Sequence, residues 1–287
     1  MNILTLVLLT AFAILTGANP VPNNASIIPR SPPQVPAHER RGIAFNNADF
    51  VHYFAVEGTH ATWCYNWDSW SPRTDAWYPF IPMLHSLRPD HTGPWMGRVE
   101  QAARDAGDGP THLLGFNEPD ICQPGAGGSC ISVGDAVAGW KTHVQPLKTL
   151  KDKMYLGSPS VSNAAASGST GLGWLANFIR ACSGCTIDFI TIHWYDRADN
   201  VGYFKKHIED ARKVAQGRPI WITEFKAEGT DEQVKRFLDE VIPWMDQSSD
   251  IHRYAYFMAR SGPGMLINDA QNGMSDLGAY YNFHHRR

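Results

Sequence analysis

The chain has 287 residues, enough for one large domain, and 43% of them are hydrophobic while 18% are charged. This composition supports a sizeable buried core and argues against wholesale disorder. The formal net charge is −3 and no long basic run occurs, so we expect no nucleic-acid partner. The ten Trp and ten Tyr could stack on sugar rings, although large domains also bury aromatic residues in their cores.

Residues 1–18 are apolar and uncharged, and they end in small residues suited to cleavage, Thr16-Gly17-Ala18. We interpret residues 1–18 as a signal peptide, which predicts a secreted protein, extracellular or in a cell wall. The segment departs from the usual pattern because no Lys or Arg stands near its start. No later stretch is apolar enough to span a bilayer, so we expect no membrane contact after signal cleavage.

Residues 19–41 are rich in Pro, Asn and Ser and show no hydrophobic periodicity, which indicates a Pro-rich linker or propeptide. The dibasic pair Arg40-Arg41 precedes the first predicted strand and suggests a processing site, after which the mature chain would start at Gly42. Asn24-Ala25-Ser26, in the same segment, is an N-glycosylation sequon.

The chain has five cysteines. An oxidising compartment would allow two local bridges, Cys122–Cys130 and Cys182–Cys185, and would leave Cys64 as a buried thiol. The second pair has Cys-x-x-Cys spacing, which also occurs in redox and zinc motifs. No second Cys pair or suitable His pair accompanies it, so a structural bridge is favoured.

Eight short apolar runs without clean alternation follow residue 41, as expected of parallel strands that are buried on both faces. They alternate with helical patterns, so an α/β fold with a parallel sheet is expected. Eight repeats over 42–287 predict a single-domain (β/α)8 TIM barrel. An open doubly wound sheet would require a Gly-rich phosphate loop after the first strand, and residues 42–47 contain none. The predicted strands are 42–46, 61–66, 80–84, 112–117, 154–160, 187–194, 219–224 and 253–259; the predicted helices are 99–106, 132–150, 172–182, 203–215, 232–245 and 277–285.

Two predicted strands, the fourth and the seventh, end on a glutamate: Glu118 and Glu224. The active sites of (β/α)8 barrels lie at the carboxyl ends of the strands, where barrel closure would bring these residues together. A single glutamate at a strand end is usually a solvated or ion-paired loop residue. Two at matching ends predict glycosidic bond cleavage, with one proton donor and one nucleophile.

Four segments carry a resemblance to a known family: WCYNW at 63–67, GFNEPD at 115–120, DFITIHWY at 188–195 and WITEF at 221–225. In this order they resemble glycoside hydrolase family 128, also described as the alkali-sensitive-linkage-protein-like glycosyl hydrolase core. The likeness covers nearly all of 42–287. It implies a (β/α)8 retaining hydrolase of β-1,3-glucan, in a family whose fungal members act on the cell wall. We expect endo cleavage rather than exo cleavage.

The resemblance also implies roles for individual residues. Glu118 would be the general acid/base and Glu224 the nucleophile, while Asn117 would hydrogen-bond the sugar 2-hydroxyl. Tyr195, at the mouth of strand six, would hydrogen-bond Glu224 and hold it ionised.

Further residues at the mouth are expected to bind substrate, each with a plainer alternative. His193 points to the same rim, or is a satisfied histidine of the barrel core. Tyr65, Asn66 and Trp67 would line the glycone side, or simply pack the rim.

The sequence departs from common barrel glycosidases on strand eight, where 254–258 has no Trp; Tyr256 is a candidate substitute. Trp221 is expected to face the helices. No tight metal-binding spacing, dinucleotide fingerprint or serine elbow occurs, so no metal or cofactor is expected.

Three rivals remain to the β-1,3-glucanase hypothesis. A β-1,4-glycanase would use the same barrel and glutamates, and a transglycosylase the same residues. A cell-wall glucan-binding protein would keep the fold without turnover. In each case the expected partner is a polysaccharide, and the protein is expected to be a monomer.

Overall fold

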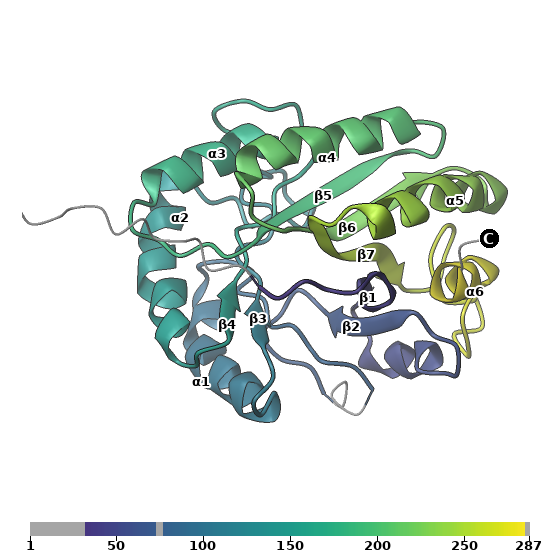
Figure 1. Ribbon diagram of the computed structural model, residues 1–287, viewed down its shortest axis with the longest axis horizontal. Helices are drawn as coiled ribbons and strands as arrows, with labels where there is room; N and C mark the ends of the chain where they lie inside the picture. Colours follow the sequence, from purple (N-terminus) through teal and green to yellow (C-terminus); the bar gives the residue numbers. More distant parts are fainter. Residues whose placement is uncertain (1–31, 73–76, 285–287) are drawn as a thin grey trace, which may run out of the picture.

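The computed structural model describes residues 32–72 and 77–284. The predicted signal peptide, the sequon and most of the Pro-rich segment lie outside this part of the chain. Its strands gather at the centre of the molecule and its helices surround them (Figure 1).

The strands form a closed parallel barrel, which confirms the predicted fold. Five strands are hydrogen-bonded in the order β2-β1-β7-β6-β5, and β3 pairs with β4. Isolated parallel bridges join β2 to residue 80, residue 83 to the end of β3, and the end of β4 to β5. The predicted strand 80–84 therefore occupies the third of the eight strand positions around the barrel. It is joined to each neighbouring strand by an isolated bridge and not by a continuous ladder. The strands are Arg41–Phe45 (β1), Ala61–Tyr65 (β2), Thr111–Leu113 (β3), Met154–Leu156 (β4), Ile190–Arg197 (β5), Ile220–Glu228 (β6) and Ile251–Ala259 (β7).

A helix lies at each predicted position, but the bounds differ and further short helices occur. The first helix begins ten residues earlier than predicted, with Pro89 in its first turn, where a missing N–H costs no hydrogen bond. Short 3-10 helices at Ala37–Glu39 and Ala48–Phe54 were not predicted. The predicted helix 132–150 is an α-helix only over Val133–Gly139 (α2) and continues as a π-helix, Trp140–Val144, and a 3-10 helix, Gln145–Thr149. The other α-helices are Pro89–Asp105 (α1), Gly171–Ala181 (α3), Val201–Ala215 (α4), Asp231–Gln247 (α5) and Asp276–Phe283 (α6). Among the described residues, none of these helices is long and apolar enough to cross a membrane.

The buried residues form an outer core between strands and helices and an inner core inside the barrel. Trp194 lies in the outer core, with its ring 5.2 Å from that of Phe237 on α5. Trp221 lies in the inner core and stacks on Phe189 at 4.2 Å, so the expectation that it faces the helices is wrong. Because both faces of a barrel strand are buried, an apolar run does not reveal which residues point inward.

Residues 35–41 pack against the end of the barrel where the strands begin, which is the end opposite the two glutamates. Arg40 and Arg41, both buried, donate to main-chain carbonyls. Arg40 bonds Val35 and three carbonyls at the end of α5, and Arg41 bonds Tyr281 of α6. In the folded protein the dibasic pair is inaccessible, so the proposed processing there would have to precede folding.

Both predicted disulfides are present. Cys122–Cys130 closes a loop of sequence separation 8 after Glu118, and Cys182–Cys185 closes a loop of separation 3 after α3. Cys64 is buried and belongs to neither bridge.

Candidate active site

Strand β5 sends a column of polar side chains up the inside of the barrel. Ile190, Ile192 and Trp194 lie in the outer core. The alternate residues Thr191 and His193 therefore point inward, and Tyr195 follows at the mouth. Regular alternation is enough to place three polar side chains one above another.

Strand β6 places its glutamate by breaking that alternation. Ile222 and Phe225 pack in the outer core, and the pairing register with β7 shifts between them. Two consecutive residues, Thr223 and Glu224, therefore both lie on the inner side. An extra residue of this kind in one strand, a β-bulge, changes the direction in which the following side chains point. Here it places Thr223 beneath the carboxylate of Glu224.

Glu118 lies just beyond β3 in a left-handed backbone conformation, with φ 38°. Few residues other than glycine adopt this region, and they do so where the surroundings impose it. Here the Glu118 N–H donates to the Ser160 carbonyl at 2.8 Å, and the preceding N–H, of Asn117, donates to the His85 carbonyl at 2.9 Å. The two neighbouring segments thus hold Glu118 over the barrel.

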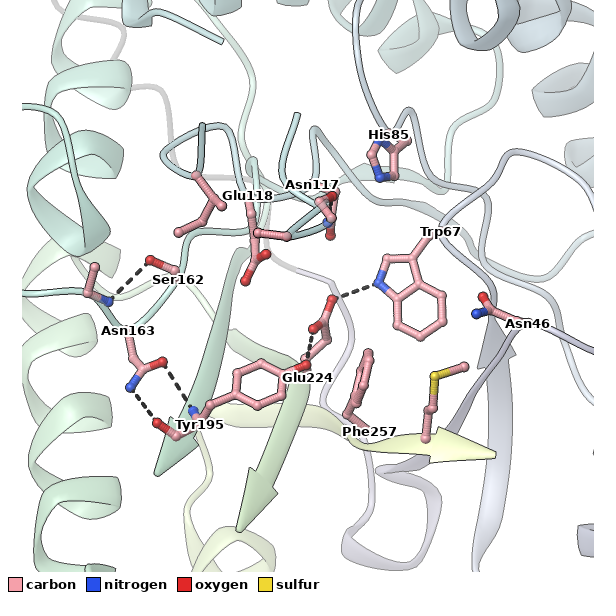
Figure 2. A pocket seen from close by; sticks show the side chains of 15 residues that line it. Asn46, Trp67, His85, Asn117, Glu118, Ser162, Asn163, Tyr195, Glu224 and Phe257 are labelled. Atoms are coloured by element: carbon pink, nitrogen blue, oxygen red, sulfur yellow. Dashed lines mark hydrogen bonds between the residues drawn. The ribbon is translucent and has the colours of Figure 1, made fainter. Parts of the chain in front are cut away.

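The fold brings Glu118 and Glu224 together around His193. His193 Nδ1 lies 2.9 Å from Glu118 Oε1, and Nε2 lies 3.0 Å from Thr223 Oγ1 and 3.3 Å from Glu224 Oε1. One atom from each of the two carboxylates and the imidazole lie within 4.8 Å of one another. The two carboxylates point toward each other across the cavity in Figure 2.

Glu224 receives two further hydrogen bonds at the mouth. Trp67 Nε1 donates to Oε1 at 2.6 Å, and the Tyr195 hydroxyl donates to Oε2, as expected from the sequence (Figure 2). Burial raises the pKa of Glu224, and the charge of Glu118 adds to this, while His193, Tyr195 and Trp67 act to lower it. Burial also raises the pKa of Tyr195, so the phenol stays protonated and remains a donor.

His193 links the two carboxylates electrostatically. Its burial acts to lower its pKa, but the charges of Glu224 and Glu118 outweigh burial, so the pKa lies above the ordinary value. The spacing of these three side chains would also suit a metal ion. Both ring nitrogens, however, already have partners at hydrogen-bond distance, an arrangement typical of groups that share protons.

The two glutamates open into a cavity of about 720 Å³. Trp67, Tyr195 and Phe257 present aromatic surface, as sugar-binding sites commonly do. Polar lining comes from Asn46, His85, Asn117, Ser162 and Asn163 (Figure 2). The cavity therefore offers both ring faces and hydrogen-bonding groups beside the carboxylates.

Three predicted substrate-binding residues do not line this cavity. His193 is fully buried beneath it. Tyr65 is also fully buried, with its hydroxyl donating to the Thr223 carbonyl at 2.8 Å. Asn66 organises its own loop, accepting from the Asp68 N–H and donating to the Trp70 carbonyl. These side chains support the site from below or beside it, whereas Asn117, Trp67 and Tyr195 line it as expected.

Three of the cavity residues that the sequence interpretation missed show why they were missed. His85 directly follows predicted strand 80–84, so its place at a strand end was a usable signal. Asn163 clamps the Tyr195 backbone through two hydrogen bonds, at 2.9 and 3.1 Å, which no motif reveals. Phe257, not Tyr256, is the aromatic residue of strand eight at the cavity, because Tyr256 packs in the outer core.

Comparison with known proteins agrees with this geometry. The family model described as glycosyl hydrolase catalytic core matches residues 42–281. Alkali-sensitive linkage protein 1 of Schizosaccharomyces pombe is 28% identical over 260 residues, which are 84% of this chain and 44% of that protein. The chain thus spans less than half the length of this relative.

Two solved structures share the fold. A GH128 subgroup III curdlan-specific exo-β-1,3-glucanase from Blastomyces gilchristii, in complex with glucose, is 33% identical with a TM-score of 0.74, covering 86% of this chain and 99% of that one. A GH128 subgroup VII oligosaccharide-binding protein from Cryptococcus neoformans is 20% identical with a TM-score of 0.67, covering 87% and 94%, and shows the fold alone. With the family model matched over the whole barrel, the chain belongs to the glycosyl hydrolase catalytic core family and, within it, to glycoside hydrolase family 128.

Proposed function

We propose that this protein hydrolyses β-1,3-glucan with retention of anomeric configuration. The observation that carries the mechanism is the approach of the two carboxylates, whose nearest oxygens lie within 4.8 Å. Retaining glycosidases hold their carboxyl groups about 5–5.5 Å apart, whereas inverting ones leave about 6.5–9.5 Å for a water molecule.

In the first step a Glu224 oxygen attacks the anomeric carbon while the glycosidic C–O bond breaks. Glu118 gives its proton to the departing oxygen, and a glycosyl ester forms on Glu224. In the second step Glu118 takes a proton from water, whose oxygen attacks the same carbon and releases Glu224. Trp67 and Tyr195 hold the attacking carboxylate in place by donating to its two oxygens.

The substrate class rests on the relatives. The Blastomyces protein, 33% identical, is described as specific for curdlan and as an exo-β-1,3-glucanase. The sequence interpretation favoured endo cleavage, so the mode of attack is a distinct question from the linkage. The products formed early in the reaction distinguish exo from endo cleavage. An exo enzyme releases one short product, whereas an endo enzyme releases oligosaccharides of many lengths. Secretion, a cell-wall setting and a monomeric state complete the proposal, and they rest on the sequence of residues 1–18 and the family likeness.

The decisive experiment measures reducing ends released from linear β-1,3-glucan, cellulose derivatives and mannan by the parent and by Glu118→Gln. Release from β-1,3-glucan alone, lost in the variant and unaffected by EDTA, is the expected result. Release from a β-1,4 polymer would overturn the linkage, and loss of activity in EDTA would assign a metal to the Glu118–His193–Glu224 cluster.

The non-hydrolytic alternative has a specific precedent in the Cryptococcus fold neighbour, described as an oligosaccharide-binding protein. Glucan binding without release of any reducing end would favour it over hydrolysis. Products longer than the substrate at high donor concentration would instead identify a transglycosylase. The presence of both glutamates, each with hydrogen-bonding partners, supports turnover.

A further inference from the structure

Strand β5 extends further toward the mouth of the barrel than the strand beside it. β4 ends at Leu156, and the pairing on this side continues through isolated bridges to His193, whose N–H donates to the Val161 carbonyl at 2.9 Å. Tyr195 lies two residues further along β5, with its main-chain groups on the same edge. The N–H and carbonyl of Tyr195 therefore need other partners if the end of the strand is to keep its position.

The side chain of Asn163 takes the place of a neighbouring strand at Tyr195. Its Oδ1 accepts from the Tyr195 N–H at 3.1 Å, and its Nδ2 donates to the Tyr195 carbonyl at 2.9 Å (Figure 2). Nδ2 also donates to the Tyr203 hydroxyl at 3.2 Å, and this hydroxyl donates to the Asn163 carbonyl at 2.8 Å. Both amide hydrogens thus have protein acceptors, although Asn163 lines the catalytic cavity. These contacts favour a role in supporting β5 over a role in contacting sugar.

The segment that carries Asn163 is held at both ends by Asp120. This buried carboxylate accepts from the Ser162 N–H at 3.2 Å, from the Ser162 hydroxyl at 2.6 Å and from the Gly171 N–H at 2.8 Å. Gly171 has a φ of 53°, and a Cβ there would lie 2.2 Å from a carbonyl oxygen of the same segment. Because Asp120 stands two residues after Glu118, the segment is tied to the chain that carries the acid/base.

These hydrogen bonds act on the side chain that orients the nucleophile. The Tyr195 hydroxyl donates to Glu224 Oε2, and where that hydroxyl lies depends on the position of the Tyr195 backbone. We propose that Asn163 is a positioning residue, which holds the Tyr195 backbone so that the hydroxyl stays bonded to Glu224. This inference rests on the proposed function, because it gives Asn163 a part in the same reaction. Without the amide, the end of β5 would lose both bonds and the phenol would no longer be held against the carboxylate.

The first test needs no turnover and measures hydrogen exchange of the Tyr195 amide by NMR. Asn163→Ala removes the acceptor of this N–H, so exchange should become about tenfold faster, as expected for the loss of one hydrogen bond. Asn177→Ala is the matched control: within the described part of the chain its amide donates to the Gly168 carbonyl of the same segment, at 2.8 Å, and to no residue of β5. An unchanged rate in Asn163→Ala, or an equal increase in the control, would overturn the proposal.

The second test is a double-mutant cycle on kcat/KM, measured from the reducing ends released from linear β-1,3-glucan. Tyr195→Phe removes the hydroxyl through which Asn163 acts. Asn163→Ala should therefore lower kcat/KM about tenfold in the parent and less than about twofold in the Tyr195→Phe background. A residue that contacted the sugar, or only packed the cavity wall, would cost the same in both backgrounds. Equal losses would contradict the inference.

The pH profile gives a third readout, which a packing defect would not move. The hydrogen bond from Tyr195 acts to lower the pKa of Glu224, because it favours the ionised carboxylate. Asn163→Ala should therefore move the acidic limb of kcat/KM, which reports ionisation of the nucleophile in the free enzyme, to higher pH. Tyr195→Phe should move the limb in the same direction, and the double variant should move it no further. A limb that stayed in place in Asn163→Ala would count against the proposal.

If Asn163→Ala fails to fold, Tyr203→Phe replaces it in all three measurements. This variant keeps Asn163 and removes the hydroxyl that bonds its amide and its carbonyl. Smaller changes in the same directions are expected, and no change in any of the three measurements would overturn the proposal. The proposed function fails separately, if the parent releases no reducing ends from β-1,3-glucan while the Tyr195 exchange test still gives its expected result.

Discussion

The two ends of the barrel both bury charged side chains, but they satisfy them differently. At the closed end Arg40 bonds four main-chain carbonyls, and Arg41 bonds the carbonyl of Tyr281. At the open end Glu118 and Glu224 share one imidazole and face a cavity. A buried charge that bonds main-chain carbonyls stabilises the fold, whereas one with unused lone pairs beside a cavity is available for chemistry.

The same contrast divides the barrel interior. The lower layer is packed with aromatic rings, among them Trp63, Phe189 and Trp221. The upper layer is a network of buried hydroxyls in which Ser160 donates to Thr191 at 3.0 Å and Thr223 bonds His193. The rigid apolar layer supports the polar layer above it, and the hydroxyl groups of the polar layer fix the positions of the catalytic side chains.

The largest expected effect on activity comes from a substitution at the open end of the barrel. Glu224→Ala removes the nucleophile, so kcat on β-1,3-glucan should fall by at least about 10⁴-fold, while the melting temperature changes little. Added azide should restore turnover and give an α-configured glycosyl azide, seen by NMR. Hydrolysis at the parent rate would show that Glu224 is not the nucleophile.

Arg40→Ala should destabilise the closed end of the barrel without changing the rate of hydrolysis. It strips four carbonyls of a charged donor, and we expect a loss of about 3 kcal/mol in unfolding free energy with kcat unchanged at low temperature. The exposed α1 residue Arg104 supplies the control, since Arg104→Ala should cost little. The mass of the secreted protein should also show Arg40 and Arg41 retained, and a start at Gly42 would show that processing precedes folding.

Thr223→Val tests the polar layer with a smaller change. It removes the hydroxyl 3.0 Å from His193 Nε2 and keeps the shape, so kcat/KM should drop about tenfold and stability by about 1 kcal/mol. Thr191→Val is the matched control, because Thr191 bonds Ser158 and Ser160 but not His193. Equal losses of kcat/KM in both variants would indicate a general packing defect.

The smallest effect is a pH dependence of stability. The pKa of folded His193 lies above its ordinary value of about 6.5, so the protonated ring stabilises the fold below that pH, and the contribution disappears as pH rises through the folded pKa. The difference in unfolding free energy between the parent and His193→Gln should therefore be largest near about pH 6 and decline toward alkaline pH. A difference that grew with pH would show that His193 is neutral in the folded protein.

Much of the site could be predicted because its signals are local. Glu118 and Glu224 end apolar runs, and the spacing of Cys122 and Cys130 suits a short bridge. The misplaced residues depend on which way a side chain points. Tyr256 and Trp221 were assigned to the wrong sides of their strands because both sides are apolar, and Asn66 was assigned to the cavity although its side chain bonds its own loop.

The sequence alone determined the succession of strands and helices, the two glutamates at strand ends and the cysteine pairs, because each depends on residues close together in the chain. Only the tertiary structure decided the register shift that turns Thr223 and Glu224 to the same side, and the burial of Arg40 and Arg41 against α5 and α6. It also brought the Asn117 side chain to the Gly127 carbonyl of the disulfide loop. These arrangements arise from contacts between segments far apart in the chain, which form only when the barrel closes.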